Sequence, residues 1–187
     1  MNWIEIAGFV FGVIGVWLTL RENVWCFPIG LANVILSLFL FFEQKLYADV
    51  LQQFVYIILL GYGWYMWIKG NEYHKKLKIS VSNPQLLLMC AIAFILCTVL
   101  LGMILSTYTD ATFPWLDSAA TSLSFVAQWM VAKKKIENWL IWIAVNIMYI
   151  GIYISKDLWL YSVLFSVYLL LAIIGYLSWR KSLRYHV

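Results

Sequence analysis

The sequence predicts an all-α integral membrane protein with seven transmembrane helices. Of its 187 residues, 64% are hydrophobic and only 12% are charged, which is far from the balance of a soluble domain. Because each membrane span takes about 20 residues, a chain of this length holds roughly seven spans joined by short loops. We therefore expect no soluble domain beside the helices.

Apolar runs supply the expected helices in order. They cover residues 4–20, 25–42, 47–68, 85–105, 111–132, 139–155 and 158–179. The first run lacks a basic start and a small-residue cleavage site and carries Glu5 near its beginning, so we interpret it as a retained helix rather than a signal peptide. The fourth run contains Cys90 and Cys97, which together with Cys26 match neither a disulfide framework nor a metal-binding spacing. We expect no metal site and no cofactor.

Basic residues fall mainly on one side of the predicted membrane. Only Lys45 and Lys156 lie in loops of the other side. By the positive-inside rule the rich side is cytoplasmic, which places the N-terminus outside and the C-terminus in the cytoplasm. This topology explains the net charge of +4, so we expect no nucleic-acid partner. The basic residues of the rich side are Arg21, Lys69, Lys75, Lys76, Lys78, Lys133, Lys134, Lys135, Arg180, Lys181 and Arg184.

Weak internal matches indicate two related triplets of helices. Since four helices separate the starts of the first and fifth spans, both triplets run in the same direction through the membrane. We predict a 3+1+3 arrangement of parallel triplets, with the first triplet in residues 1–70, a loop and linker helix in 71–110, and the second triplet with a tail in 111–187. Chance similarity among aromatic-rich helices is the alternative. The matches, at offsets of 114, 114 and 113, are Leu46-Tyr47 with Leu160-Tyr161, Gly61-Tyr62 with Gly175-Tyr176, and Asn33 with Asn146.

Polar side chains recur at helical spacing inside five of the spans. Each costs free energy in lipid unless it faces a partner or a water-filled path. Ser and Thr are ordinary in helix packing, but four amides on four helices are harder to explain as packing alone. We predict that these amides, Asn33, Gln53, Gln128 and Asn146, face one shared cavity. The other members of the polar stripes are Ser37, Asp49, Tyr56, Asp117, Thr121, Ser124, Tyr149, Tyr153, Ser162 and Ser166.

The sixth span carries the most informative stripe. Trp139, Trp142 and Asn146 follow at spacings of three and four, so they share one face of the helix. This pattern favours a ligand site at membrane depth. An interfacial tryptophan belt with an asparagine bonded to a neighbouring helix is the alternative.

The residues within the spans limit both the reaction and the substrate. No Lys, Arg or His lies deep within a span, so we expect a neutral or cationic substrate and not a phosphate or carboxylate. Amides can bind a carboxamide or sugar hydroxyls, and aromatic faces can stack on a flat cationic ring. No paired nucleophile and base and no glycine-rich phosphate loop are present, so we expect a transporter and not an enzyme.

The chain resembles the PnuC family of bacterial vitamin transporters. The resemblance rests on the stretches ENVWCFPIGLANVILSLFLFF and KLYADVLQQFVYIILLGYGWYMWIKG, the Ala127-Gln128-Trp129 segment and ENWLIWIAVN. It implies a fold similar to that of the sugar transporters called SWEETs, a homotrimer in the bacterial inner membrane, and uptake of nicotinamide riboside by facilitated diffusion. It also implies that a cytoplasmic kinase phosphorylates the vitamin and so prevents its escape.

The resemblance assigns substrate contacts by matching position. Trp142 and Asn146 would line the central site, with Trp139 at its edge, and the Gln53 and Gln128 amides would contact substrate. Thiamine is the alternative substrate, because it too is a flat cation that a kinase could trap, whereas riboflavin is larger and neutral. We expect alternating access, with the triplets rocking and Pro28 as a candidate hinge. Tyr56, Asn33 and Ser124 are added because they share the faces of these residues.

Overall fold

The chain folds into α-helices, most of them joined by short turns, and residues 70–83 connect α3 to α4. The computed structural model describes residues 3–43, 47–70, 77–157 and 159–184. Lys45, Leu46, Lys75, Lys76 and Leu158, which the sequence argument used, lie outside the described residues. The helices are α1 (Trp3–Leu20), α2 (Cys26–Glu43), α3 (Tyr47–Lys69), α4 (Pro84–Tyr108), α5 (Pro114–Ala132), α6 (Asn138–Ser155) and α7 (Trp159–Arg184).

The helices coincide with the expected spans except at some ends. α5 begins at Pro114 and not at residue 111, because a proline is well suited to the first helical turn and the residue before it is disfavoured in helical conformation. α7 continues to Arg184, past the expected end at residue 179. Its last residues are polar, so an apolar window stops short of the true end of the helix.

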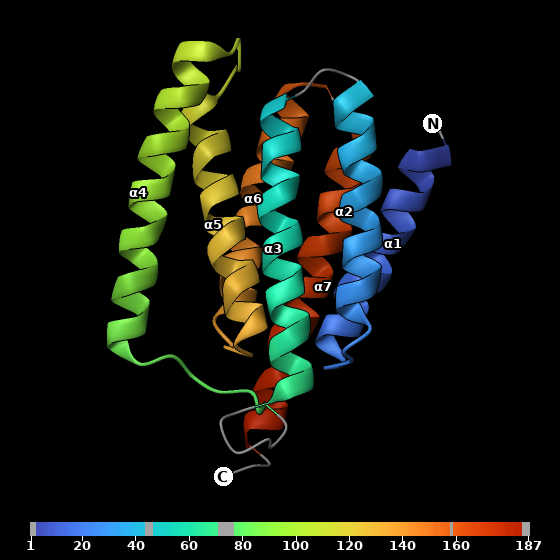
Figure 1. Ribbon diagram of the computed structural model, residues 1–187, viewed down its shortest axis with the longest axis vertical. Coiled ribbons are helices and arrows are strands. Elements are labelled where there is room, and N and C mark those ends of the chain that lie inside the picture. Colours follow the sequence, from blue (N-terminus) through green and yellow to red (C-terminus); the bar gives the residue numbers. More distant parts are fainter. Residues whose placement is uncertain (1–2, 44–46, 71–76, 158, 185–187) are drawn as a thin grey trace.

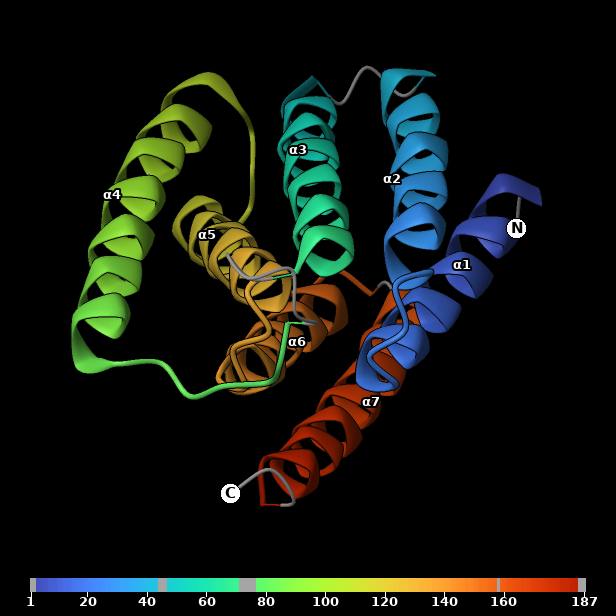
Figure 2. The ribbon, with the colours of Figure 1, turned by 60° about the horizontal axis from the view of Figure 1, so that its bottom comes forward.

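Six of the helices close into a ring. Around the ring the neighbours are α1, α2, α3, α5, α6 and α7, and α7 returns to contact α1. α4 lies outside, and within the described part of the chain it contacts α5 alone (Figures 1 and 2). Successive helices run in opposite directions, so α1 begins and α7 ends at opposite ends of the bundle (Figure 1).

One end of the bundle carries most of the charge. We call it the basic end, and Lys156 lies at the opposite end, in the turn between α6 and α7. Buried side chains also concentrate near the basic end, among them Leu20, Trp67 and Trp179. The ring is therefore packed most tightly there. The described Lys and Arg residues of the basic end are Arg21, Lys69, Lys78, Lys133, Lys134, Lys135, Arg180, Lys181 and Arg184.

The inner helix boundaries of the two triplets recur at an interval of 112 residues, whereas the starts of α1 and α5 are 111 apart and the ends of α3 and α7 are 115 apart. The 112-residue interval differs from the offsets of 113 and 114 that the sequence matches indicate. The glycines matched at 114 also lie in different surroundings, since Gly61 is exposed with open space around it and Gly175 is buried against Trp139. The recurring boundaries are the ends Leu20 and Ala132, the starts Cys26 and Asn138, the ends Glu43 and Ser155, and the starts Tyr47 and Trp159.

An aromatic pair closes the first triplet near the basic end. Phe27 of α2 meets Trp67 of α3 edge to face, with ring centroids 5.0 Å apart. A side chain at Gly63 would clash with the Phe27 ring, so glycine lets α2 and α3 approach here.

The second triplet contains the same packing 112 residues later. Trp139 of α6 meets Trp179 of α7 edge to face at 5.4 Å, and the Trp139 ring lies against Gly175. The two pairs have interplanar angles of 88° and 89°. The triplets thus resemble each other in packing even where their residues differ.

Several helices have the length and composition of membrane spans. Among the described residues these are α4, α6 and the Tyr161–Arg184 part of α7, with shorter apolar stretches at Ile6–Leu20 and Cys26–Phe39. α3 and α5 carry the polar stripes, which lower their hydropathy. Most apolar side chains of α4 are exposed, which is expected of a helix that lipid surrounds.

Candidate functional site

Hydroxyl groups from three helices meet inside the ring. The hydroxyl of Tyr56 on α3 interacts with Ser124 on α5 and with Gln52. The hydroxyl of Tyr149 on α6 interacts with the same two residues and lies 3.4 Å from the Thr121 hydroxyl. The polar stripes of α3, α5 and α6 therefore face one another as predicted.

Aromatic rings continue this group across the ring of helices. Tyr149 contacts Phe165 of α7 at a centroid distance of 4.8 Å, and Phe165 contacts Tyr168 at 5.7 Å. The Tyr168 hydroxyl occupies the space that a side chain at Gly12 of α1 would need, and the Asn33 amide lies beside the same position. Aromatic and polar groups thus run from α5 to α1 and α2 through the middle of the molecule. We call this group the polar band, and it consists of Gln52, Tyr56, Thr121, Ser124, Tyr149, Phe165 and Tyr168 with the Asn33 amide at its end.

Three predicted amides lie on the faces that bound this band. Gln53 and Asn146 are 9% and 3% exposed, and Gln128 is half-buried. Helical spacing places Gln53 with Tyr56, Gln128 with Ser124 and Asn146 with Tyr149. Within the described residues none of the three has a hydrogen-bond partner. Buried amides are costly unless they bond to something, so these groups are suited to contact a polar ligand.

The two tryptophans of the α6 stripe lie in different surroundings. Trp139 is 2% exposed and enclosed by Trp179 and Gly175, and its indole Nε1 has no partner among the described residues. Trp142 is half-buried at the border of the apolar core, one turn nearer to Asn146. Trp142 is therefore better placed to reach the polar band than Trp139, whose assignment to the site edge stays a prediction.

An ion pair joins the two triplets at the basic end. Lys134 Nζ lies 2.8 Å from Glu22 Oε2 and 4.4 Å from the centre of the Trp67 ring. The Lys134 side chain is 10% exposed and that of Glu22 is 33% exposed. Both residues have positive φ, 54° for Glu22 and 50° for Lys134, at equivalent places in the turns after α1 and α5. The pair stabilises two turns whose backbone is otherwise unfavourable.

Charge inside the ring is sparse. Asp117 lies near the opposite end and pairs with Lys156 at 3.8 Å, so it is not an isolated intramembrane acid. The side chain of Asp49, the other predicted acid, lies outside the described residues. No cluster of His, Cys, Asp and Glu able to hold a metal occurs in the described part of the chain.

The chain matches a family model described as nicotinamide mononucleotide transporter, over residues 2–181. The match covers the six-helix ring and α4. The chain belongs to this transporter family. It is accordingly a membrane transporter and not an enzyme.

Two relatives with assigned functions are distant in sequence but match over nearly the whole chain. The nicotinamide riboside transporter PnuC of Escherichia coli (strain K12) is 26% identical, over 98% of this chain and 87% of the relative. The riboflavin/roseoflavin transporter RibM of Streptomyces davaonensis is 23% identical, over 95% and 84%. A crystal structure of the vitamin B3 transporter PnuC superposes with a TM-score of 0.78 at 23% identity, over 99% of this chain and 83% of that one. This likeness confirms the fold.

Three residues of the band were not predicted from the sequence. Gln52 is adjacent in sequence to the predicted Gln53. Only its contacts with Tyr56 and Tyr149 in the structure show that it belongs to the site. Phe165 and Tyr168 share one face of α7 at a spacing of three, a signal that the sequence contained. Aromatic residues are common in these helices, so that spacing alone did not separate them from core residues.

Proposed function

We propose that this chain takes up nicotinamide riboside by facilitated diffusion. The observation that carries the proposal is the set of unpaired amides beside an aromatic band inside the ring, with no cation among them. Amides can bind the carboxamide and ribose hydroxyls, and aromatic faces attract a pyridinium ring. The proposed substrate contacts are Asn33, Gln53, Tyr56, Ser124, Gln128, Trp142 and Asn146, with Trp139 at the edge.

The same residues favour the riboside over the mononucleotide. A phosphate needs Arg, Lys or an array of backbone N–H donors when it leaves water. Every Lys and Arg among the described residues falls in a turn, a connecting segment or the last turns of a helix. For the mononucleotide, the free-energy cost of removing water from the phosphate would therefore exceed the gain from contacts in this site.

We further propose that transport proceeds by alternating access between two triplets in a SWEET-like 3+1+3 arrangement. The triplets would be residues 1–70 and 111–187, with the linker in 71–110. The 112-residue recurrence of boundaries and packing supports this division. The Glu22–Lys134 pair joins the triplets at the basic end, so it must separate when that end opens. Pro28, the third residue of α2, remains a candidate hinge.

The cellular setting follows from the charge distribution and the family. All seven helices would span the bacterial inner membrane, with the basic end in the cytoplasm and the N-terminus outside. A cytoplasmic kinase would phosphorylate the vitamin, and the charged product could not return through a site without cations. We propose a homotrimer on the family resemblance alone.

Two other vitamins are candidate substrates. Thiamine is a flat cation that suits the same chemistry. Riboflavin is favoured by one observation, the match to the RibM relative named above. The nicotinamide riboside relative is matched at higher identity, which is why we rank that substrate first.

Titration calorimetry on the purified, detergent-solubilised protein tests the proposal. Nicotinamide riboside, nicotinamide mononucleotide, thiamine and riboflavin are compared side by side. We expect binding of nicotinamide riboside and at least tenfold weaker binding of the mononucleotide, because its phosphate finds no cation. Binding of thiamine or riboflavin alone would reassign the substrate, and equal binding of the mononucleotide would contradict the charge argument.

A further inference from the structure

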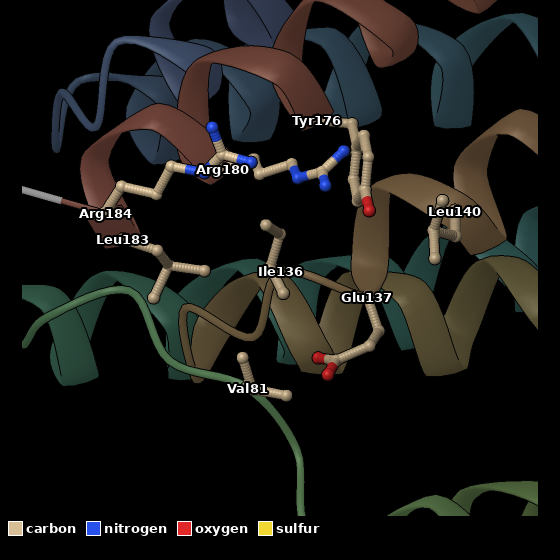
Figure 3. A pocket seen from close by; sticks show the side chains of 8 residues that line it. All are labelled: Val81, Ile136, Glu137, Leu140, Tyr176, Arg180, Leu183 and Arg184. Carbon is tan, nitrogen blue, oxygen red and sulfur yellow. The ribbon is translucent and has the colours of Figure 1, made fainter. Parts of the chain in front are cut away.

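A groove lies on the outer surface of the bundle at the basic end. It has a volume of about 750 Å³ and runs between the last turns of α7 and the start of α6 (Figure 3). Val81, in the segment that leads to α4, closes its far side. The groove thus lies outside the six-helix ring and apart from the amide site. The lining residues used below are Val81, Glu137, Leu140, Tyr176, Arg180 and Arg184.

The groove combines two unpaired guanidinium groups with apolar walls. Arg180 and Arg184 are one turn apart on α7 and both are exposed. In the described part of the chain neither has a carboxylate within ion-pair distance. Leu140 and Val81 are 49% and 63% exposed, so the walls also present apolar surface.

The acid on the rim of the groove is engaged elsewhere. Glu137 Oε1 accepts a hydrogen bond from the Ser82 backbone N–H at 2.8 Å, and Oε2 accepts one from the Ser82 hydroxyl at 2.9 Å. In Figure 3 its carboxylate points away from the two arginines. Glu137 therefore leaves the positive charge of the groove uncompensated.

Comparison of the two triplets indicates that the fold does not require arginines at these positions. At the 112-residue interval, Arg180 corresponds to Ile68 and Tyr176 to Trp64, so the first triplet carries exposed apolar residues and no arginine there. α3 ends at Lys69, whereas α7 continues three residues past the equivalent position, Lys181, to Arg184. The basic groove is thus an addition to the second triplet.

We propose that this groove binds one anionic phospholipid. The headgroup phosphate would lie between Arg180 and Arg184, whose planar guanidinium groups suit phosphate oxygens. The acyl chains would follow Leu140 and Val81 along the surface that faces the membrane. Basic pockets at the cytoplasmic ends of membrane helices recognise anionic headgroups in this way. The inference needs the membrane setting but does not depend on which vitamin is carried.

Native mass spectrometry of the purified full-length protein tests this proposal. Adducts with phosphatidylglycerol and with phosphatidylcholine are measured for the wild type and for Arg180→Gln/Arg184→Gln. The matched control is Arg21→Gln/Lys69→Gln, which removes two positive charges from the same end but outside the groove. A further sample contains inorganic phosphate in excess. If the double variant cannot be purified, Arg184→Gln alone replaces it, with an expected loss of about fivefold.

The wild type is expected to retain phosphatidylglycerol in preference to phosphatidylcholine. The arginine double variant should lose at least about tenfold of that affinity, since each arginine near an anionic surface contributes substantially. The control variant should bind like the wild type, and inorganic phosphate should not displace the lipid. Equal losses of lipid affinity in the arginine variant and in the control would mean that only the total surface charge matters, and this would overturn the proposal. So would unchanged binding by the arginine variant, or displacement by inorganic phosphate, which would indicate a free-anion site.

Discussion

Gly175 shows how a single missing side chain fixes the packing of α6 against α7. A Cβ atom there would lie 2.7 Å from the Trp139 ring, which is 2% exposed and also contacts Trp179 edge to face, so it has little room to move. We expect Gly175→Ala to destabilise the protein by about 1–3 kcal/mol through overpacking. This loss is larger than the stabilisation that alanine gives through its higher helix propensity. Thermal unfolding in detergent measures the effect.

Gly151 provides the matched control for this prediction. It lies in the neighbouring helix α6 with no atom within 4 Å of its Cβ position. Gly151→Ala should leave thermal stability unchanged or raise it slightly, because alanine favours the helix. If both alanine variants unfold at the wild-type temperature, the close contact at Gly175 is not rigid.

Asn146 carries the prediction on substrate binding. Its amide is buried and has no hydrogen-bond partner among the described residues, so we expect it to bond to substrate. Asn146→Leu removes one or two such bonds and should weaken nicotinamide riboside binding about tenfold or more, with uptake falling in parallel. Calorimetry and whole-cell uptake measure the two effects.

The control replaces an amide outside the ring. Gln85 is exposed in the first turn of α4, and Gln85→Leu should leave binding and uptake unchanged. Normal uptake by a well-expressed Asn146→Leu protein would remove Asn146 from the proposed site.

At the residue scale the sequence indicated the amides but not their neighbours. Helical spacing put Gln53, Gln128 and Asn146 on polar faces, and the structure brings the faces of α3, α5 and α6 together. Spacing within one helix cannot predict contacts with another. The spacing of residues in α6 could therefore not predict that Trp139 packs against Trp179 of the next helix.

At the element scale, hydropathy located every helix but not every end. Apolar runs locate the part of a helix that lipid or core surrounds, and the polar last turns of α7 fall outside that rule. The turns were still less predictable. The positive φ of Glu22 and Lys134 comes with no glycine, and their ion pair joins residues 112 positions apart.

The Glu22–Lys134 pair predicts how the basic end responds to loss of one charge. Cys26 is 4% exposed and close enough to Lys134 to interact with its charge, so it serves as a native reporter once Cys90 and Cys97 are replaced by serine. Lys134→Gln should speed maleimide labelling of Cys26 about five- to tenfold, because a partly buried ion pair and a cation–π contact are lost. Removing a nearby positive charge disfavours the reactive thiolate, so electrostatics alone would slow the labelling.

Arg21→Gln is the control for this experiment. It removes the same charge from the turn after α1, where the Arg21 guanidinium lies 5.4 Å from the centre of the Trp17 ring and forms no ion pair among the described residues. Labelling of Cys26 should stay at the wild-type rate. Equal acceleration in both variants would mean that the pair does not hold the basic end closed.

At the scale of the whole molecule, the order of helices in the ring was not predicted. The sequence matches indicated two triplets, but the offset taken from isolated dipeptides differs from the 112-residue interval of the helix boundaries. Packing residues explain this difference, since Phe27 and Trp139 fill equivalent positions without being identical. A repeat preserved in shape more than in residue type leaves little trace in one sequence.

The ring of two triplets makes a final prediction about motion. If the triplets rock against each other, a covalent link between Glu22→Cys and Lys134→Cys should abolish exchange of substrate but leave binding intact. A reducible bifunctional reagent forms the link in a background without Cys26, Cys90 and Cys97, and exchange is measured in proteoliposomes. Reduction should restore exchange. The control pair, Ser82→Cys with Glu137→Cys, links the segment before α4 to the second triplet only and should leave exchange unchanged. Undiminished exchange in the fully linked Glu22–Lys134 variant would contradict rocking, because substrate would then cross the membrane while the basic end of the ring stays closed.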